Sequence, residues 1–284
     1  RRVLFRSQLN ALTSLQLAAW NTAQIDAIQT ADIANLSTGQ IVTFNSAQLN
    51  ALNTNQLAVL NSAQIIAIEL SDVASLTTTQ VSAFSTTQVG SFTTAQITQL
   101  GVVQLRSFSS VQVAALNSNQ IASLTTTQIR ALIDTQVVAL SSAQINSLTS
   151  TQIAALQGFQ VTSIETGDIA AMTTSQIAAL FASQLKNIST GTLTILSTTQ
   201  IDAIQSANIV NFTSAQVAAL TTTQVTALNS LQLAALNSTH FNGFTSLQLA
   251  TFSTNQLLAI DTADINNLKG LDKELGKSDV PETI

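Results

Sequence analysis

Glutamine recurs at every eighth position along almost the whole chain, and this period constrains the fold more than any other feature. Gln occupies 26 of the 33 positions that are multiples of eight between 8 and 264. The next residue is Ile, Val or Leu in every unit except at Phe241, and another large apolar residue stands four positions after each multiple of eight. No insertion or deletion breaks this register. The chain is therefore expected to fold as an array of 33 equivalent units.

The repeated phrase has the pattern of a helix start. In the stretch LTTTQV, Thr221 and Gln224 have the spacing of a capping box, in which each side chain accepts a hydrogen bond from the backbone N–H of the other residue. Leu220 and Val225 stand at the positions of a hydrophobic staple. Val225 and Leu228, three residues apart, fall on one face of a helix. Each unit is therefore predicted to contain one very short helix.

Three architectures come into question for such units: a single long helix, a β-solenoid and a solenoid of very short helices. A single long helix is excluded, because eight residues at about 100° each overshoot two turns by roughly 80° and the apolar stripe would wind around the axis. A β-solenoid is the alternative, since Thr, Val and Ile favour strands. However, apolar positions three apart lie on opposite faces of a strand. We therefore predict an all-α solenoid of very short helices over residues 1–268, held together by stacking of successive coils.

Three further features concern the extent of the solenoid and the size of its coil. Residues 269–284 are charged, include the single Pro, and are predicted to form a C-terminal cap or an exit linker. Several unusual residues lie 40 positions apart, which hints at five octads per coil: Asp32 and Asp72, Asp168 and Asn208, Phe44 and Phe84, and Phe212 and Phe252. The repeats run almost to residue 1, so we expect the chain to be part of a longer protein.

Where Asp or Asn replaces the Gln, the residue three positions earlier usually changes to an acid or an amide as well. The pairs are Gln29 with Asp32, Glu69 with Asp72, Glu165 with Asp168, Gln205 with Asn208, and Asp261 with Asp264. Because the two positions change together, we interpret them as side chains in contact at a hydrogen-bonded corner.

Few residues are candidates for catalysis or ligand binding. His240, the single His, occupies a Gln position and is interpreted as a substituted capping residue rather than a general base. The acidic pairs Glu69/Asp72, Glu165/Asp168 and Asp261/Asp264 have the chemistry for acid–base work or for binding a hard cation. They are scattered, and acids also suit a helix N-terminus, so they are interpreted as structural variation. We predict no catalytic, cofactor-binding or metal-binding residues, no cofactor, and no enzyme activity.

Composition narrows the range of partners. Charged residues make up 8 % of the chain, with nine Lys and Arg and a net charge of −5. Nucleic-acid binding depends on basic residues that neutralise phosphates, so nucleic acid is not expected as a partner. No apolar run approaches the ~18 residues that span a bilayer, so membrane insertion is not expected. Cys is absent, which excludes disulfides and thiolate metal sites.

The repeated phrase also resembles known repeats. The pattern Leu-Thr-x-x-Gln-Val-x-Ala-Leu is similar to the helix start of transcription-activator-like effector repeats, but nothing here matches their base-reading loop. As a whole, the chain resembles the Thr/Gln/Ala-rich short-repeat regions of very large secreted or surface proteins of bacteria, including filamentous and adhesin-like ones. This resemblance implies a bacterial extracellular or cell-surface location.

From these features we expect a structural protein that forms a rigid rod, a stalk or a self-assembling extracellular filament. Low charge permits close packing of such rods, and open solenoid ends favour end-to-end association. Self-association, end-to-end or lateral, is thus the expected partnership. The alternative is a binding module whose regular Ser/Thr face recognises ice, a glycan or another surface.

Overall fold

The structure, a computed structural model, describes residue 9 and residues 11–264 of the 284-residue chain. Within these residues the regular elements are all α-helices, and no strand is assigned. The predicted all-α fold is therefore confirmed, and the β-solenoid alternative is wrong for the described part. The predicted cap or linker at 269–284 lies outside the described residues. The chain divides into two compact units, Arg1–Leu148 and Thr149–Ile284.

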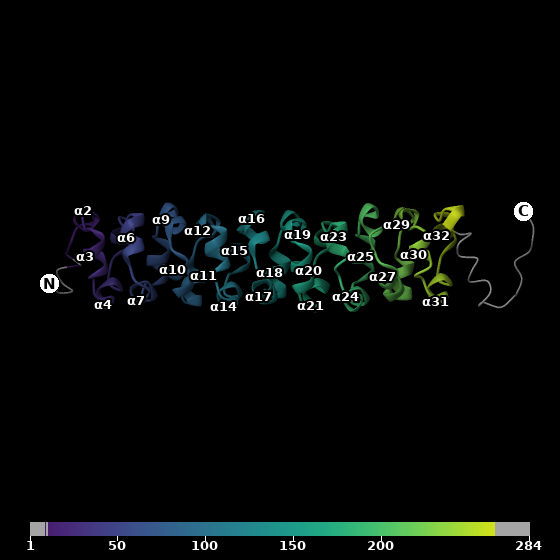
Figure 1. The fold of residues 1–284 in the computed structure, drawn as a ribbon, viewed down its shortest axis with the longest axis horizontal. Helices are drawn as coiled ribbons and strands as arrows, with labels where there is room; N and C mark the ends of the chain where they lie inside the picture. Colours follow the sequence, from purple (N-terminus) through teal and green to yellow (C-terminus); the bar gives the residue numbers. More distant parts are fainter. Residues whose placement is uncertain (1–8, 10, 265–284) are drawn as a thin grey trace, which may run out of the picture. The chain divides into compact units, whose positions relative to one another are not determined.

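The helices of the first unit each have four to six residues and follow one another at the octad spacing (Figure 1). They are α2 (Ser14–Ala18), α3 (Thr22–Asp26), α4 (Thr30–Ile33), α5 (Thr38–Ile41), α6 (Ser46–Ala51), α7 (Thr54–Ala58), α8 (Ser62–Ile66), α9 (Leu70–Ser75), α10 (Thr78–Ala83), α11 (Thr86–Ser91), α12 (Thr94–Gln99), α13 (Val102–Arg106), α14 (Ser110–Ala114), α15 (Ser118–Ser123), α16 (Thr126–Ala131), α17 (Asp134–Val138) and α18 (Ser142–Ser147).

The helices of the second unit have the same lengths and spacing. They are α19 (Ser150–Ala155), α20 (Gly158–Ser163), α21 (Thr166–Ala170), α22 (Thr174–Ala178), α23 (Ala182–Leu185), α24 (Thr190–Ile195), α25 (Thr198–Asp202), α26 (Ser206–Ile209), α27 (Ser214–Ala219), α28 (Thr222–Thr226), α29 (Ser230–Ala235), α30 (Ser238–Phe241), α31 (Ser246–Leu249) and α32 (Thr254–Leu258).

Most helix starts are the predicted capping boxes. At α28, the Gln224 N–H donates to Thr221 Oγ1 over 3.2 Å, and the Thr221 N–H donates to Gln224 Oε1 over 2.8 Å. Leu220 and Val225 on either side are buried. Because a four- to six-residue helix is far below the length that is stable alone, these local bonds select the helix start, and packing must stabilise it.

The corner between α27 and α28 is made of extended residues and does not require glycine. Leu220 ends α27 at φ −59° and ψ 136°, and the next residue, Thr221, caps α28 at φ −70° and ψ 156°. L-residues adopt both conformations without strain. The same apolar residue therefore closes one helix, turns the chain and enters the core, which explains how the chain makes so many corners with nine Gly.

Within each unit, every helix packs on the helix three places further along the chain. This order runs from α2 on α5 to α15 on α18 in the first unit, and from α19 on α22 to α29 on α32 in the second. The two apolar positions of each octad form the core; Val113, for example, is 0 % exposed and Leu116 is 2 % exposed. Side chains also bond to carbonyls 28 and 31 residues earlier, so a turn holds between three and four octads. The five-octad relation suggested by residues 40 apart is wrong.

Candidate functional site

The most distinctive chemical feature of the fold is a ladder of buried Gln side chains that joins successive turns. Gln128, in α16, is 3 % exposed. Its Oε1 accepts from the Thr125 N–H over 2.8 Å and so completes the capping box of its own helix. Its Nε2 donates to the carbonyls of Ile97 and Leu100, in the preceding turn, over 2.9 and 2.8 Å. One amide group thus bonds two turns together.

The ladder provides hydrogen-bond partners for backbone groups that short helices leave unpaired. A helix leaves its first four N–H groups and last four C=O groups without partners inside the helix, so in a four- to six-residue helix most backbone groups are affected. Each Gln of the ladder accepts from an N–H at the start of its own helix and donates to carbonyls at the end of a helix one turn earlier. The same pair of bonds, with donors 28 and 31 residues after their acceptors, recurs at Gln40, Gln48, Gln56, Gln64, Gln80, Gln88, Gln96, Gln104, Gln112, Gln120, Gln128, Gln136 and Gln144 in the first unit. In the second unit it recurs at Gln184, Gln216, Gln224, Gln232, Gln248 and Gln256.

The hydrogen bond that the Gln side chain accepts at the helix start is more constant than the bond that the cap side chain accepts. Four helices begin after a residue whose side chain makes no capping bond, yet its backbone N–H still donates to the Gln Oε1: Gly101, Ile133, Gln157 and Phe181. The Ser/Thr of the phrase is thus replaceable, whereas the Gln carries contacts in two directions. In the described residues, no buried side-chain N or O atom is left without a hydrogen-bond partner.

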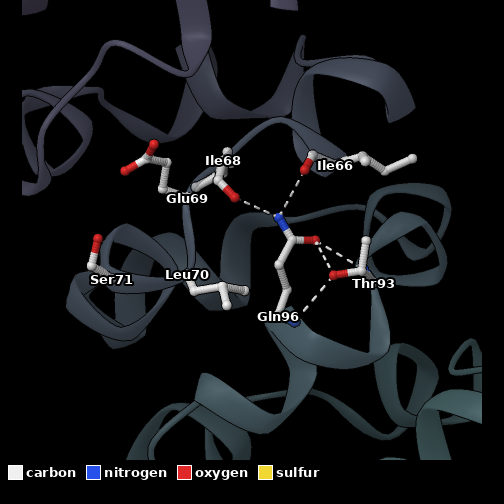
Figure 2. A pocket seen from close by; sticks show the side chains of 7 residues that line it. All are labelled: Ile66, Ile68, Glu69, Leu70, Ser71, Thr93 and Gln96. Atoms are coloured by element: carbon white, nitrogen blue, oxygen red, sulfur yellow. Dashed lines mark hydrogen bonds between the residues drawn. The ribbon is translucent and has the colours of Figure 1, made fainter.

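One open hollow, with a volume of about 450 Å³, lies beside this ladder in the first unit. Figure 2 shows Gln96 at its centre, donating to the carbonyls of Ile66 and Ile68 and accepting from Thr93. The exposed side chains of Glu69 and Leu70 lie on the rim. The Gln96 amide is already bonded within the fold, so it is not available to a ligand in this hollow.

His240 replaces a Gln in the ladder and reproduces both of its contacts. Its Nδ1 accepts from the Asn237 N–H over 3.2 Å, and its Nε2 lies 3.0 Å from the carbonyl oxygen of Phe212, 28 residues earlier. This arrangement requires the tautomer that carries its proton on Nε2, where it donates to the carbonyl. His240 is 5 % exposed. The interpretation of His240 as a capping residue is confirmed, and both ring nitrogens are engaged in the fold.

In four of the five acidic and amide pairs, the side chain of the first residue makes no capping hydrogen bond: Gln29, Glu69, Glu165 and Gln205. These four side chains therefore do not act as helix caps. The physical reason is length, since cap side chains that accept from the helix N–H groups are short. At Asp261, Oδ1 accepts from the Ala263 N–H, and no bond between the Asp261 and Asp264 side chains is described.

The residues that replace Gln in these units bond to the preceding turn instead. Asp72 Oδ1 accepts from the Ser46 hydroxyl over 2.6 Å, and Asn208 Nδ2 donates to the Leu180 carbonyl over 3.0 Å. Thr192 Oγ1 lies 3.2 Å from Thr166 Oγ1, 26 residues earlier. Asp72, Asn208 and Thr192 therefore take part in joining turns. Among the described residues, no group of three or more His, Asp or Glu side chains is placed to hold a metal ion.

Some of the hydroxyl groups on the outer surface make hydrogen bonds to a neighbouring turn. Ser82 Oγ donates to the Ser107 carbonyl of the next turn over 2.9 Å, and Ser91 Oγ donates to Ser62 Oγ over 2.7 Å. The basic residues Arg106, Arg130 and Lys186 are exposed. None of the helices in the described part combines the length and hydropathy needed to cross a bilayer.

Sequence reasoning found the capping role of Gln but missed its bond to the preceding turn. One signal was available. A capping box accepts Glu as readily as Gln, yet Glu is absent from all 33 positions. Only the amide has donor hydrogens as well as an acceptor oxygen. The absence of Glu therefore indicates that the side chain at this position also donates a hydrogen bond, here to the preceding turn.

The comparisons with known proteins agree with this reading of the repeats. The model of the ALTTAQ repeat matches four consecutive stretches, residues 6–38, 33–67, 65–102 and 99–126. Each matched stretch spans roughly one turn of the fold. No curated protein matches the chain. Residues 6–126 are therefore similar to ALTTAQ repeats, and the chain has the architecture of a short-repeat protein.

Proposed function

We propose that this chain is a structural, non-enzymatic repeat protein that forms a rigid rod, stalk or self-assembling filament on a bacterial cell surface or outside the cell. The observation that carries the proposal is the Gln ladder. It places a fixed pair of hydrogen bonds between successive turns inside each unit, in addition to the apolar core. An interior built from one repeated interface favours a rigid scaffold, because each turn is held directly to the next.

The surface location rests on the resemblance to short-repeat regions of large bacterial surface proteins and on the composition. Few charges and many Ser and Thr give a polar surface with weak electrostatic repulsion, which suits close packing of copies. The partners that we propose are other copies of the chain, with neither nucleic acid nor membrane insertion.

The alternative remains a binding module with a Ser/Thr face for ice, a glycan or another surface. Hydroxyls that bond to a neighbouring turn, such as those of Ser82 and Ser91, are less available to a ligand. Exposed cations at Arg106 and Arg130 also interrupt the outer surface. These two observations favour the structural proposal.

Negative-stain electron microscopy of the purified chain, over a range of concentrations and with and without calcium, tests the proposal. Uniform rods or fibres are expected, with a repeat along the axis that matches the stacking of turns. Compact globular particles would overturn it. A screen for ice and glycan binding on the same sample tests the alternative, and strong binding by a particle that does not assemble would favour the binding module.

A further inference from the structure

Exposed apolar side chains are concentrated on every third helix of the chain. Between residues 42 and 231, all of which the structure describes, eleven large apolar side chains are exposed. Eight of them lie on every third helix from α5 to α29, or on its cap residues: Val42, Ile66, Val111, Val138, Phe159, Phe181, Val210 and Leu231. The other three are Leu70, Val103 and Ile195. One third of the helices therefore carries most of the exposed apolar surface.

Within the second unit, the helices of this series pack on one another. α20 packs on α23, α23 on α26, and α26 on α29. The exposed fraction is 46 % for Phe159, 54 % for Phe181, 36 % for Val210 and 74 % for Leu231. Each of the four helices thus contributes one exposed apolar side chain from its length or its caps, and we call the four helices with their caps the apolar line.

Another line of helices in the same unit has the opposite chemistry. α19, α22, α25 and α28 also pack on one another in this order. The N-cap and the first two positions of each hold only Ser or Thr: residues 149–151, 173–175, 197–199 and 221–223. These side chains are exposed or half-buried, and none of the four helices has an exposed large apolar side chain. We call them the hydroxyl line. Exposed apolar surface is therefore a property of the apolar line and not of the unit as a whole.

The apolar line exposes enough surface for an interface of moderate size. With about 150–200 Å² for a fully exposed side chain of this size, its four apolar residues expose on the order of 300–400 Å². Because protein interfaces are about 57 % apolar, a contact centred on the line would bury on the order of 500–700 Å² of each copy. Two copies together thus reach the ~1,000 Å² that a specific interface requires.

We infer that the apolar line binds the apolar line of a second copy, in antiparallel orientation. A partner with the same spacing of helices meets each apolar residue with another, and a second copy has this spacing. A two-fold axis between α23 and α26 places α20 opposite α29, and α23 opposite α26. Phe159 then meets Leu231, and Phe181 meets Val210. This inference rests on the proposed function and adds the surface for lateral association and its orientation.

Charge favours the antiparallel orientation and a protein partner. Lys186, the C-cap of α23, is exposed and is the one charged residue among the four helices and their caps. A parallel contact would place the Lys186 side chains of the two copies side by side, and like charges across an interface oppose association. In the antiparallel contact Lys186 lies opposite α26, which carries no charge. A single Lys also gives little attraction to an anionic lipid surface, which requires a cluster of basic residues.

The double variant Phe159→Glu/Leu231→Glu tests the surface. Both residues are exposed and precede the Gln of their octads, in the first turn of a helix, where Glu is favoured by the helix dipole. The fold is therefore expected to be unchanged, which circular dichroism checks. The matched control, Thr151→Glu/Thr223→Glu, makes the same change at the same octad position on the hydroxyl line. We expect the association constant from sedimentation equilibrium to fall by about tenfold or more in the first variant, and to be unchanged in the control.

Cross-linking tests the orientation, because the chain has no native Cys. Thr162→Cys and Ala234→Cys each place one thiol at an exposed position, in α20 and α29. In the antiparallel contact, a short bis-maleimide should join the two variants to each other when they are mixed, and should join each variant to itself far less. Linkage of each variant to itself, with little linkage between the two, would overturn the antiparallel orientation.

The outcomes separate this inference from the proposed function. Association of the wild type and the control, together with its loss in Phe159→Glu/Leu231→Glu, supports the inference. If all three proteins associate equally, copies meet through another surface, and the inference is overturned while the proposed function stands. If the wild type stays monomeric at all concentrations, the inference is also overturned, and a role as a single spacer or stalk stands.

Flotation with phosphatidylcholine vesicles distinguishes a lipid surface from a second copy. We expect no flotation of the wild type. Flotation of a monomeric wild type that is lost in Phe159→Glu/Leu231→Glu would assign the apolar line to lipid and overturn the inference.

Discussion

Replacing one ladder Gln by Glu should separate its two roles in the interior of the first unit. In Gln128→Glu the acceptor oxygen for the Thr125 N–H remains, while the donors to the carbonyls of Ile97 and Leu100 are lost. Because this position is 3 % exposed, water cannot replace the missing bonds. The variant therefore tests the bond between turns without removing the cap.

The expected loss follows from the two contacts. Each lost hydrogen bond contributes about 1 kcal/mol, and a buried acceptor that faces other acceptors adds about 1–3 kcal/mol. The total is about 3–5 kcal/mol at neutral pH. At acidic pH the introduced carboxyl is protonated and can donate one hydrogen bond, so the loss should become smaller as the pH falls.

Native-state hydrogen exchange followed by mass spectrometry is the appropriate assay, because repeat proteins often unfold in parts rather than as one unit. Amides of α12 and α16 should exchange more than about 100-fold faster in Gln128→Glu. Gln16→Glu, the same change where Nε2 has no described partner, is the control and should alter exchange little. Equal effects of the two substitutions, or no effect of Gln128→Glu, would refute the role of the ladder.

Three further experiments test other parts of the repeat. His240→Gln should keep both ladder contacts and leave the thermal midpoint unchanged or higher. His240→Leu should lower the free energy of unfolding by about 2 kcal/mol or more, because it leaves the Asn237 N–H and the Phe212 carbonyl unpaired. Equal midpoints for the two variants would contradict the role given to His240. Gly243→Ala should lower the free energy of unfolding by about 1–3 kcal/mol, because the new Cβ would lie 2.8 Å from the Ser214 carbonyl oxygen. Its control is Gly167→Ala, which has open space around the new Cβ and should be neutral or slightly stabilising. Chemical denaturation of both variants measures the difference. Ile133→Thr adds a side-chain acceptor to a helix start that lacks one and should raise stability by about 0.5–1 kcal/mol; a lower midpoint would show that packing of Ile133 outweighs the cap.

Local structure was largely predictable because the interactions that specify it span a few residues. The pairing of Thr221 with Gln224, the burial of Leu220 and Val225, and the choice of helix over strand all follow from spacings of three to five residues. The prediction for His240 succeeded for the same reason, since its ring nitrogen replaces the amide oxygen in the same local contact. The bond from the Ser46 hydroxyl to Asp72 Oδ1 was not predictable in this way, because the two residues are 26 positions apart.

By itself, the sequence determined the eight-residue unit, its capping box, its two core positions and the all-α class. Only the tertiary structure decided how many octads complete a turn, and therefore which carbonyls the Gln amide reaches. The reason is that the turn size depends on corner angles added over several units, so small backbone differences at residues such as Leu220 change which segments meet. The absence of Glu from the Gln positions indicates that a donor is needed, but the acceptors, such as Ile97 and Leu100, are identified only when the turns are stacked.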